Sequence, residues 1–189
     1  MSEPAAPTGA ASRRGPLLAL IAVAVLLAGF FVVAYSPKGT PVGGVLPADP
    51  TGFKAPQVSL PNLDGSGPLS LASFKGKPIV VNFWASWCNT CIAEAALLGD
   101  ADRKYRKQGV VFLGMDSSDT TASARAFMAK YGIEYTSFID VTAGQNRRWG
   151  VTGYPETFFI GRDGRIVSKY ISSIDARTLY ASIAAILQS

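Results

Sequence analysis

The sequence predicts an α/β fold in which a central mixed sheet is flanked by helices. Continuous apolar runs typical of strands buried on both faces alternate with helical segments, which favours parallel strands joined by crossover helices. Near the end of the chain, Asp163-Gly164 separates two apolar strands, which indicates an antiparallel hairpin. Because both kinds of connection are present, we expect a sheet that is parallel at first and antiparallel at its end.

The first half of the folded part contains three predicted strands and one long helix. Short strands are expected at 57–60 and 69–71, and the apolar run 79–85 is typical of a strand buried on both faces. A helix should follow from Cys88 and continue to Lys107, with Gly109 just beyond its end.

The second half continues the alternation of strands and helices. These elements are a buried strand at 110–115, a helix at 122–131, a strand at 137–141, a short helix at 143–149, hairpin strands at 156–160 and 165–170, and a last helix from Asp175 to Leu187. No internal repeat interrupts this order.

A predicted membrane anchor precedes the folded part. Residues 17–35 carry no charge, and as a helix they would span about 28 Å, close to the ~30 Å hydrocarbon core of a bilayer. Arg13 and Arg14 stand just before this segment, so the positive-inside rule places residues 1–16 in the cytoplasm. A cleaved signal peptide is the alternative, although its apolar region is shorter. We expect a single-pass protein of the cell membrane whose domain is extracytoplasmic.

A spacer should separate the anchor from the domain. Residues 36–52 are rich in glycine and proline, which excludes an amphipathic helix and is typical of a linker. Residues 53–189 then suit one domain of ordinary size.

Composition excludes several kinds of site. The chain of 189 residues has two cysteines and no histidine, which excludes a Cys/His zinc site, a cysteine–histidine dyad and a serine–histidine–aspartate triad. We expect no metal site and no cofactor. The net charge of +5 is scattered, and the longest basic cluster, 103–107, has Asp100 and Asp102 beside it. A solvated helix surface is therefore favoured over a nucleic-acid interface.

Cys88 and Cys91 form the predicted redox centre, at the junction of a buried strand and a helix. A helix N-terminus lowers the pKa of a thiol, and two intervening residues bring the second sulfur within bridging distance. A purely structural disulfide closing so short a loop would constrain the unfolded chain very little. We predict that Cys88 attacks the client disulfide and that Cys91 resolves the mixed disulfide.

Two further positions allow two interpretations each. Pro155 starts an apolar strand, either as an ordinary edge-strand proline or after a cis bond that turns the backbone toward the disulfide. Glu94 lies three residues after Cys91. It is either a solvated glutamate in the first turns of the helix or a carboxylate near the buried thiol that relays its proton.

The motifs around these residues resemble the membrane-anchored thiol-disulfide reductases of the thioredoxin superfamily, the TlpA/ResA/DsbE group that includes cytochrome c biogenesis proteins. The resemblance rests on 81–91 (VNFWASWCNTC) and 153–160 (GYPETFFI), and it extends to 53–60 and 71–80. It implies a thioredoxin-like fold with an inserted αβ segment at about 116–141.

The resemblance also assigns roles to individual residues. It implies a cis Pro155, a functional Glu94, and Glu156 as a second acidic residue, with Trp87 and Thr157 in supporting or substrate-binding positions. Two departures stand out. Asn89-Thr90 replaces the commoner pairs that contain proline, and Tyr154 is bulkier than the usual residue before this proline, which narrows the expected substrate groove. A peroxidatic Thr-x-x-Cys motif is absent, because Ala85 stands at the threonine position.

The activity implied is that of a dithiol reductant outside the cytoplasm. The expected client is the disulfide of the Cys-x-x-Cys-His segment of apocytochrome c, and the expected electron donor is a membrane thiol-transporting protein of the CcdA/DsbD type. Alternatives are a thiol reductase or metallochaperone for copper-site assembly in a respiratory oxidase, a general disulfide oxidoreductase, and an anchored binding module whose disulfide is structural.

Overall fold

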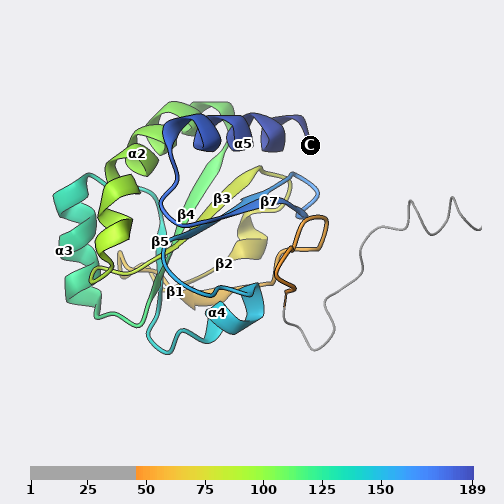
Figure 1. The fold of residues 1–189 in the computed structure, drawn as a ribbon. Coiled ribbons are helices and arrows are strands. Elements are labelled where there is room, and N and C mark those ends of the chain that lie inside the picture. The colour runs from red at the N-terminus through yellow and green to blue at the C-terminus, as the bar shows by residue number, and fades with distance from the viewer. Residues whose placement is uncertain (1–45) are drawn as a thin grey trace, which may run out of the picture. The chain divides into compact units, whose positions relative to one another are not determined.

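A five-stranded mixed sheet organises the computed structural model, which describes residues 46–189 (Figure 1). The predicted anchor 17–35 and the linker residues 36–45 lie outside the described residues. Within residues 46–189, no helix is long and apolar enough to cross a membrane.

The strand order of this sheet is β5-β4-β3-β6-β7. The central strand β3 (Ile79–Trp84) pairs parallel with β4 (Val111–Ser117) and antiparallel with β6 (Glu156–Ile160). On the outer sides, β5 (Ser137–Asp140) runs parallel to β4, and β7 (Ile166–Ile171) runs antiparallel to β6. The predicted mixed sheet with a terminal hairpin is confirmed.

The helices divide between the two faces of the sheet (Figure 1). One face is covered by α2 (Asn89–Tyr105), α3 (Thr121–Tyr131) and α5 (Ala176–Gln188). The other face is covered by α4 (Gly144–Trp149) and by the two-stranded hairpin of β1 (Ser59–Pro61) and β2 (Pro68–Ser70).

Alternation along β3 shows why its sequence is apolar throughout. Val80 and Trp84 belong to the core beneath α2, α3 and α5, whereas Val81 and Phe83 belong to the core on the opposite face. Because successive side chains of a strand point to opposite faces, a strand between two covered faces needs apolar residues at nearly every position. The exception is Asn82, which is buried and hydrogen-bonded.

Local sequence signals set the ends of the helices. Thr120 and Asp175 cap α3 and α5 by accepting hydrogen bonds from the backbone N–H groups of Ser123 and Thr178. The chain leaves α3 through Gly132, whose φ of 67° is the left-handed conformation that glycine adopts without strain. The long helix α2 ends at Tyr105, slightly before the predicted end, because its last turn tightens into a 3₁₀ turn.

Residues 46–52 pack on the domain, ahead of the predicted boundary at Phe53. Leu46 is buried in the core, and its N–H donates to the carbonyl of Arg148 at 3.0 Å. Gly52 N–H donates to the carbonyl of Ile166 at 2.7 Å. The last residues of the predicted linker therefore pack on the domain, because one buried leucine and two backbone hydrogen bonds hold a segment that composition alone assigns to a spacer.

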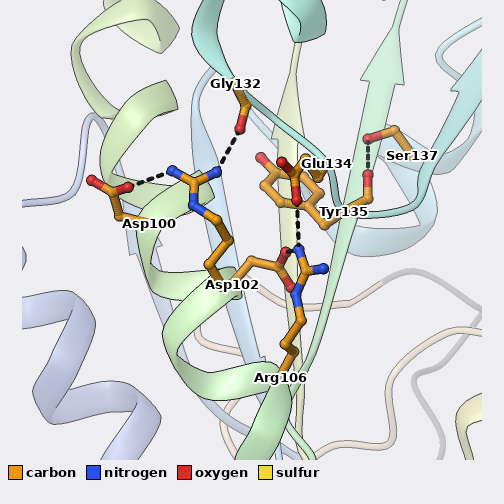
Figure 2. A network of polar contacts seen from close by, with 8 residues as sticks. Asp100, Asp102, Arg106, Gly132, Glu134, Tyr135 and Ser137 are labelled. Atoms are coloured by element: carbon orange, nitrogen blue, oxygen red, sulfur yellow. Dashed lines mark hydrogen bonds and ion pairs between the residues drawn. The ribbon is translucent and has the colours of Figure 1, made fainter.

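Ion pairs tie the second half of α2 to the segment that leads into β5 (Figure 2). Arg106 pairs with Asp102 and with Glu134, the latter at 3.3 Å, and Arg103 pairs with Asp100. Two of the cations in the basic cluster 103–107 therefore have carboxylate partners. The Arg103–Asp100 and Arg106–Glu134 pairs are exposed and contribute about 0–1 kcal/mol each, whereas Asp102 is buried.

Close packing across the sheet makes Gly114 on β4 sensitive to substitution. A Cβ at this position would lie 2.2 Å from Ser137 Oγ and 2.7 Å from Trp84 Nε1. We predict that Gly114→Ala lowers the free energy of unfolding by about 1–3 kcal/mol through overpacking. Chemical denaturation of the oxidised full-length protein in detergent measures the effect. Gly153→Ala is the matched control, since a Cβ there meets open space, and equal effects of the two substitutions would contradict the prediction.

Candidate active site

Cys88 and Cys91 form a disulfide at the N-terminus of α2, with their Cα atoms 5.3 Å apart. Cys88 is the N-cap of the helix, and its Sγ accepts a hydrogen bond from the backbone N–H of Cys91 at 3.1 Å. The first N–H groups of a helix have no partner within the helix, and the helix dipole is positive at this end. A thiolate on Cys88 is therefore stabilised where the fold places it.

The two sulfurs differ in their position on the helix. Cys91 lies within the first turn of α2 and is buried, and Cys88 is nearly as buried at 6% exposure. The neighbouring Trp87 is 57% exposed, and its Nε1–H donates to the carbonyl of Ser118 at 3.0 Å. Access to the disulfide is thus narrow, beside an exposed indole ring.

Thr90 connects the disulfide to the loop before β6. Its hydroxyl lies 3.4 Å from Cys88 Sγ and donates to the carbonyl of Tyr154 at 3.2 Å. The sequence shows Thr90 only as a departure from proline-containing pairs. The feature of the sequence that could have identified Thr90 is its hydroxyl, which can form hydrogen bonds with a neighbouring sulfur or with a backbone carbonyl.

The Tyr154–Pro155 peptide bond is cis, which decides between the two interpretations of Pro155. The ring of Tyr154 packs edge-on against Trp87, with 5.6 Å between the ring centroids, and its hydroxyl accepts from Asn146. The carbonyl of Pro155 accepts from Ser172 N–H at 2.9 Å. Tyr154 therefore packs on Trp87 beside the disulfide.

Glu156 holds the loop that carries the cis proline. Its carboxylate accepts hydrogen bonds from the N–H and the hydroxyl of Thr152, both at 2.8 Å, and from Gly153 N–H at 3.3 Å. It also forms a buried ion pair with Lys169 at 2.8 Å. These partners show a carboxylate that shapes residues 152–155. Nothing among its contacts brings it to the sulfurs.

Glu94 is buried, at 1% exposure, one turn after Cys91 on α2. Its carboxyl oxygens accept from Asn82 Nδ2 at 2.8 Å and from Ile174 N–H at 2.7 Å. Burial raises the pKa of Glu94 to about 7, and the two hydrogen bonds offset part of that rise. The solvated-glutamate interpretation is therefore wrong, because the side chain faces the core.

A chain of hydrogen bonds joins Glu94 to the strand that starts at the cis proline. Asn82 Nδ2 donates both to Glu94 and to the hydroxyl of Thr157 on β6, the latter at 3.0 Å. Asn82 thus links α2, β3 and β6 directly below the disulfide loop. Sequence reasoning did not select Asn82, although a polar residue inside a fully buried strand is the signal that identifies it.

The segment after β4 supports the loop before Cys88, a contact that the sequence patterns did not predict. Asp119 Oδ2 accepts from Ser86 N–H at 2.7 Å. The nearby Asp116 is fully buried, and burial together with the charge of Asp119 raises its pKa to about 8. The hydrogen bond from Ser86 N–H to Asp119 fixes the backbone immediately before Trp87.

These features define a thiol-disulfide oxidoreductase with a thioredoxin-like fold. A redox disulfide caps a helix at the end of the central strand, and a cis-proline loop faces it. The chain belongs to the AhpC/TSA family, whose model matches residues 51–169.

Comparisons with known proteins agree with this class. The chain is 37% identical to the thiol:disulfide interchange protein DsbE of Pseudomonas fluorescens biotype C over 131 residues, which cover 69% of this chain and 71% of that protein. It is 33% identical to the thiol:disulfide interchange protein HelX of Rhodobacter capsulatus, over 77% of this chain and 81% of that one. A thiol:disulfide interchange protein of known structure from Chlorobium tepidum matches with a TM-score of 0.65 at 26% identity, over 75% and 99% of the two chains.

The contact between Thr90 and Cys88 predicts a change in thiol acidity. In the reduced protein the Thr90 hydroxyl can turn from the Tyr154 carbonyl and donate to the Cys88 thiolate instead, so we expect Thr90→Val to raise the pKa of Cys88. The pH dependence of Cys88 alkylation, followed by mass spectrometry, measures it. Asn89→Ala changes the other residue between the cysteines and should leave the profile in place. A Thr90→Val profile that overlays the wild type would show that the hydroxyl does not act on the sulfur.

The raised pKa of Glu94 predicts a pH dependence of stability. Its folded-state pKa of about 7 exceeds the ordinary value of 4.5, so the folded state binds the proton more tightly. The contribution of Glu94 to the free energy of unfolding is therefore greatest below pH ~4.5. This contribution falls by about 3 kcal/mol as the pH rises through 7.

Urea denaturation of the oxidised protein at several pH values measures this slope. Glu94→Gln should flatten it between pH ~4.5 and ~7. Asp116→Asn should flatten it over a range that extends to pH ~8. A Glu94→Gln slope parallel to that of the wild type would contradict the assignment.

Proposed function

We propose that this protein is a dithiol reductant outside the cytoplasm that reduces the haem-binding cysteines of apocytochrome c. The observation that carries the proposal is the disulfide at the N-terminus of α2, faced by the cis Tyr154–Pro155 bond and followed by the buried Glu94. The resemblance to cytochrome c biogenesis proteins supplies the client, and the relatives named DsbE and HelX support thiol–disulfide interchange.

The reaction begins from the reduced protein. The Cys88 thiolate attacks one sulfur of the client disulfide, a mixed disulfide forms, and the other client sulfur leaves as a thiolate that takes up a proton. Cys91 then loses its proton and attacks Cys88 Sγ. This step forms the Cys88–Cys91 bond and releases the second client thiol. In total, the client disulfide gains two electrons from the two cysteines and two protons, one from Cys91 and one that Cys88 gave to the solvent when it ionised.

Glu94 is the base that assists the second half of this reaction. It lies one turn from Cys91 on the same helix, and its pKa of about 7 allows it to accept a proton near neutral pH. Only the ionised carboxylate can accept the Cys91 proton, and this form is populated at neutral pH because the pKa is about 7. Asn82 and the Ile174 N–H keep the carboxyl oriented through both steps.

The client reaches the disulfide past exposed apolar side chains. Trp87 and Ile92 are both exposed beside the disulfide, and Tyr154 packs on Trp87. The Tyr154 carbonyl already accepts a hydrogen bond from the Thr90 hydroxyl. A client backbone N–H must therefore compete with this hydroxyl for the carbonyl, or the client carbonyl must pair with a backbone N–H of the loop. A short unfolded segment fits this narrow entrance better than a folded surface does.

The anchor and the electron donor complete the proposed function. Residues 17–35 anchor the chain in the cell membrane with its N-terminus cytoplasmic, and a donor of the CcdA/DsbD type re-reduces the disulfide. The inserted segment at 116–141 contains α3 and β5. It supplies Ser118 and Asp119, which hold the loop before Cys88.

Deletion of the gene in the native host tests the client. We expect covalent c-type haem to fall to background while oxidase copper stays loaded, and an added small thiol reductant should restore the cytochromes. Wild-type and Asn89→Ala genes should complement the deletion, whereas Cys88→Ser should not. Normal c-type cytochromes beside a copper-deficient oxidase would overturn the proposed client and favour copper-site assembly.

A further inference from the structure

A second site lies at the end of the sheet opposite the disulfide. The central strand β3 starts at Ile79 and leads at its far end to Cys88. Ile79 and the end of the antiparallel strand β6 line a pocket of about 660 Å³ together with residues 54–57, 71–72 and 74–77. Pockets that bind small ligands are typically of about 300–1,000 Å³, so this one is large enough for a ligand.

The floor of this pocket is apolar. Ala55, Leu71, Ile79 and Ile160 are buried there, and Phe74 is half-buried beside them. An apolar surface of this kind gains free energy when a hydrocarbon chain displaces water from it.

The rim of the pocket is cationic. Its exposed basic residues are Lys54, Lys75, Lys77, Arg148 and Arg162. Asp163 is the acidic residue of the rim, and its carboxylate is paired with Arg165 at 3.3 Å. Within the described part of the chain, Lys75, Lys77 and Arg148 have no carboxylate partner. Unpaired cations around an apolar floor select a ligand with a negative head and an apolar tail.

We infer that this pocket binds an anionic phospholipid of the membrane, with an acyl chain on the apolar floor and the phosphate among Lys75, Lys77 and Arg148. The path of the chain supports a membrane source. Leu46 N–H donates to the carbonyl of Arg148, so the described fold begins at the rim of the pocket. The ten residues 36–45 separate it from the apolar segment 17–35 and reach at most about 35 Å.

The identification of the ligand as a membrane lipid rests on the membrane anchoring in the proposed function. The preference of the pocket for a ligand with an anionic head and an apolar tail does not depend on that anchoring. Each basic residue near an anionic bilayer strengthens binding. With the rim engaged, the disulfide at the other end of β3 is directed away from the lipid surface, where a soluble client can reach Cys88.

Native mass spectrometry of the full-length protein in neutral detergent tests the inference. We expect a bound dioleoyl-phosphatidylglycerol in several-fold preference to dioleoyl-phosphatidylcholine, which has the same acyl chains. The variant Lys75→Gln/Lys77→Gln/Arg148→Gln should lose at least about tenfold of the phosphatidylglycerol affinity. Ala72→Trp, which fills the pocket from an exposed position and keeps every charge, should lose binding as well.

A matched variant removes the same charge elsewhere. Lys107→Gln/Lys130→Gln/Arg177→Gln changes three exposed cations outside the pocket and should keep the preference. Equal losses in the two triple variants would show attraction to general surface charge and overturn the site. Displacement of the lipid by glycerol phosphate alone would show a free-anion site and also overturn it.

Two further readings separate this inference from the proposed function. Insulin disulfide reduction should be the same in the wild type and in all three variants, because none of the changed residues contacts the redox centre. Release of the full chain from membranes by alkaline washing would overturn the anchoring. Loss of the phosphatidylglycerol preference in protein that stays membrane-bound would overturn the pocket.

Discussion

The hydrogen bond from the Cys91 N–H to Cys88 Sγ is the contact on which the rest of the structure depends. This hydrogen bond requires a helix to start at Cys88, so the chain must pass from the end of β3 at Trp84 into α2 within a few residues. A sulfur that caps a helix satisfies a backbone donor and gains stability as a thiolate from the same group. The redox chemistry of the site is thus a property of the start of α2, and the remaining contacts hold that start in place.

Three segments converge on this helix start from different parts of the chain. Asp119, after β4, holds the backbone at Ser86. Tyr154, before β6, receives the hydroxyl of Thr90. Glu94 reaches from α2 to Ile174, just ahead of α5. A parallel pair and an antiparallel pair share β3, so the mixed sheet brings the end of β4 and the start of β6 to the same edge.

Sequence patterns predicted the elements that depend on local chemistry. The apolar run of β3, the start of the last helix at Asp175 and the Asp-Gly hairpin all appear in the structure within a few residues of their predicted positions. The paired cysteines identified the redox centre, since their spacing and their place between a buried strand and a helix are both visible in the sequence.

Contacts between distant segments could not be predicted in this way. Whether Glu94 faces solvent or the core depends on Asn82 and Ile174, which lie 12 and 80 residues away along the chain. The support from Asp119 and the burial of Leu46 depend likewise on segments that meet only in the folded protein. Helical periodicity places a residue on a face, but packing decides what covers that face.

Trapping of the mixed disulfide tests the central claim, that the N-cap sulfur is the attacking one, most directly. Reduced Cys91→Ser and Cys88→Ser proteins are each mixed with a peptide that carries a Cys-x-x-Cys disulfide, and the adducts are resolved by mass spectrometry. The account predicts that Cys91→Ser accumulates an adduct through Cys88, because no second thiol of the protein is left to complete the exchange, and that Cys88→Ser forms little. Accumulation in Cys88→Ser with none in Cys91→Ser would contradict it.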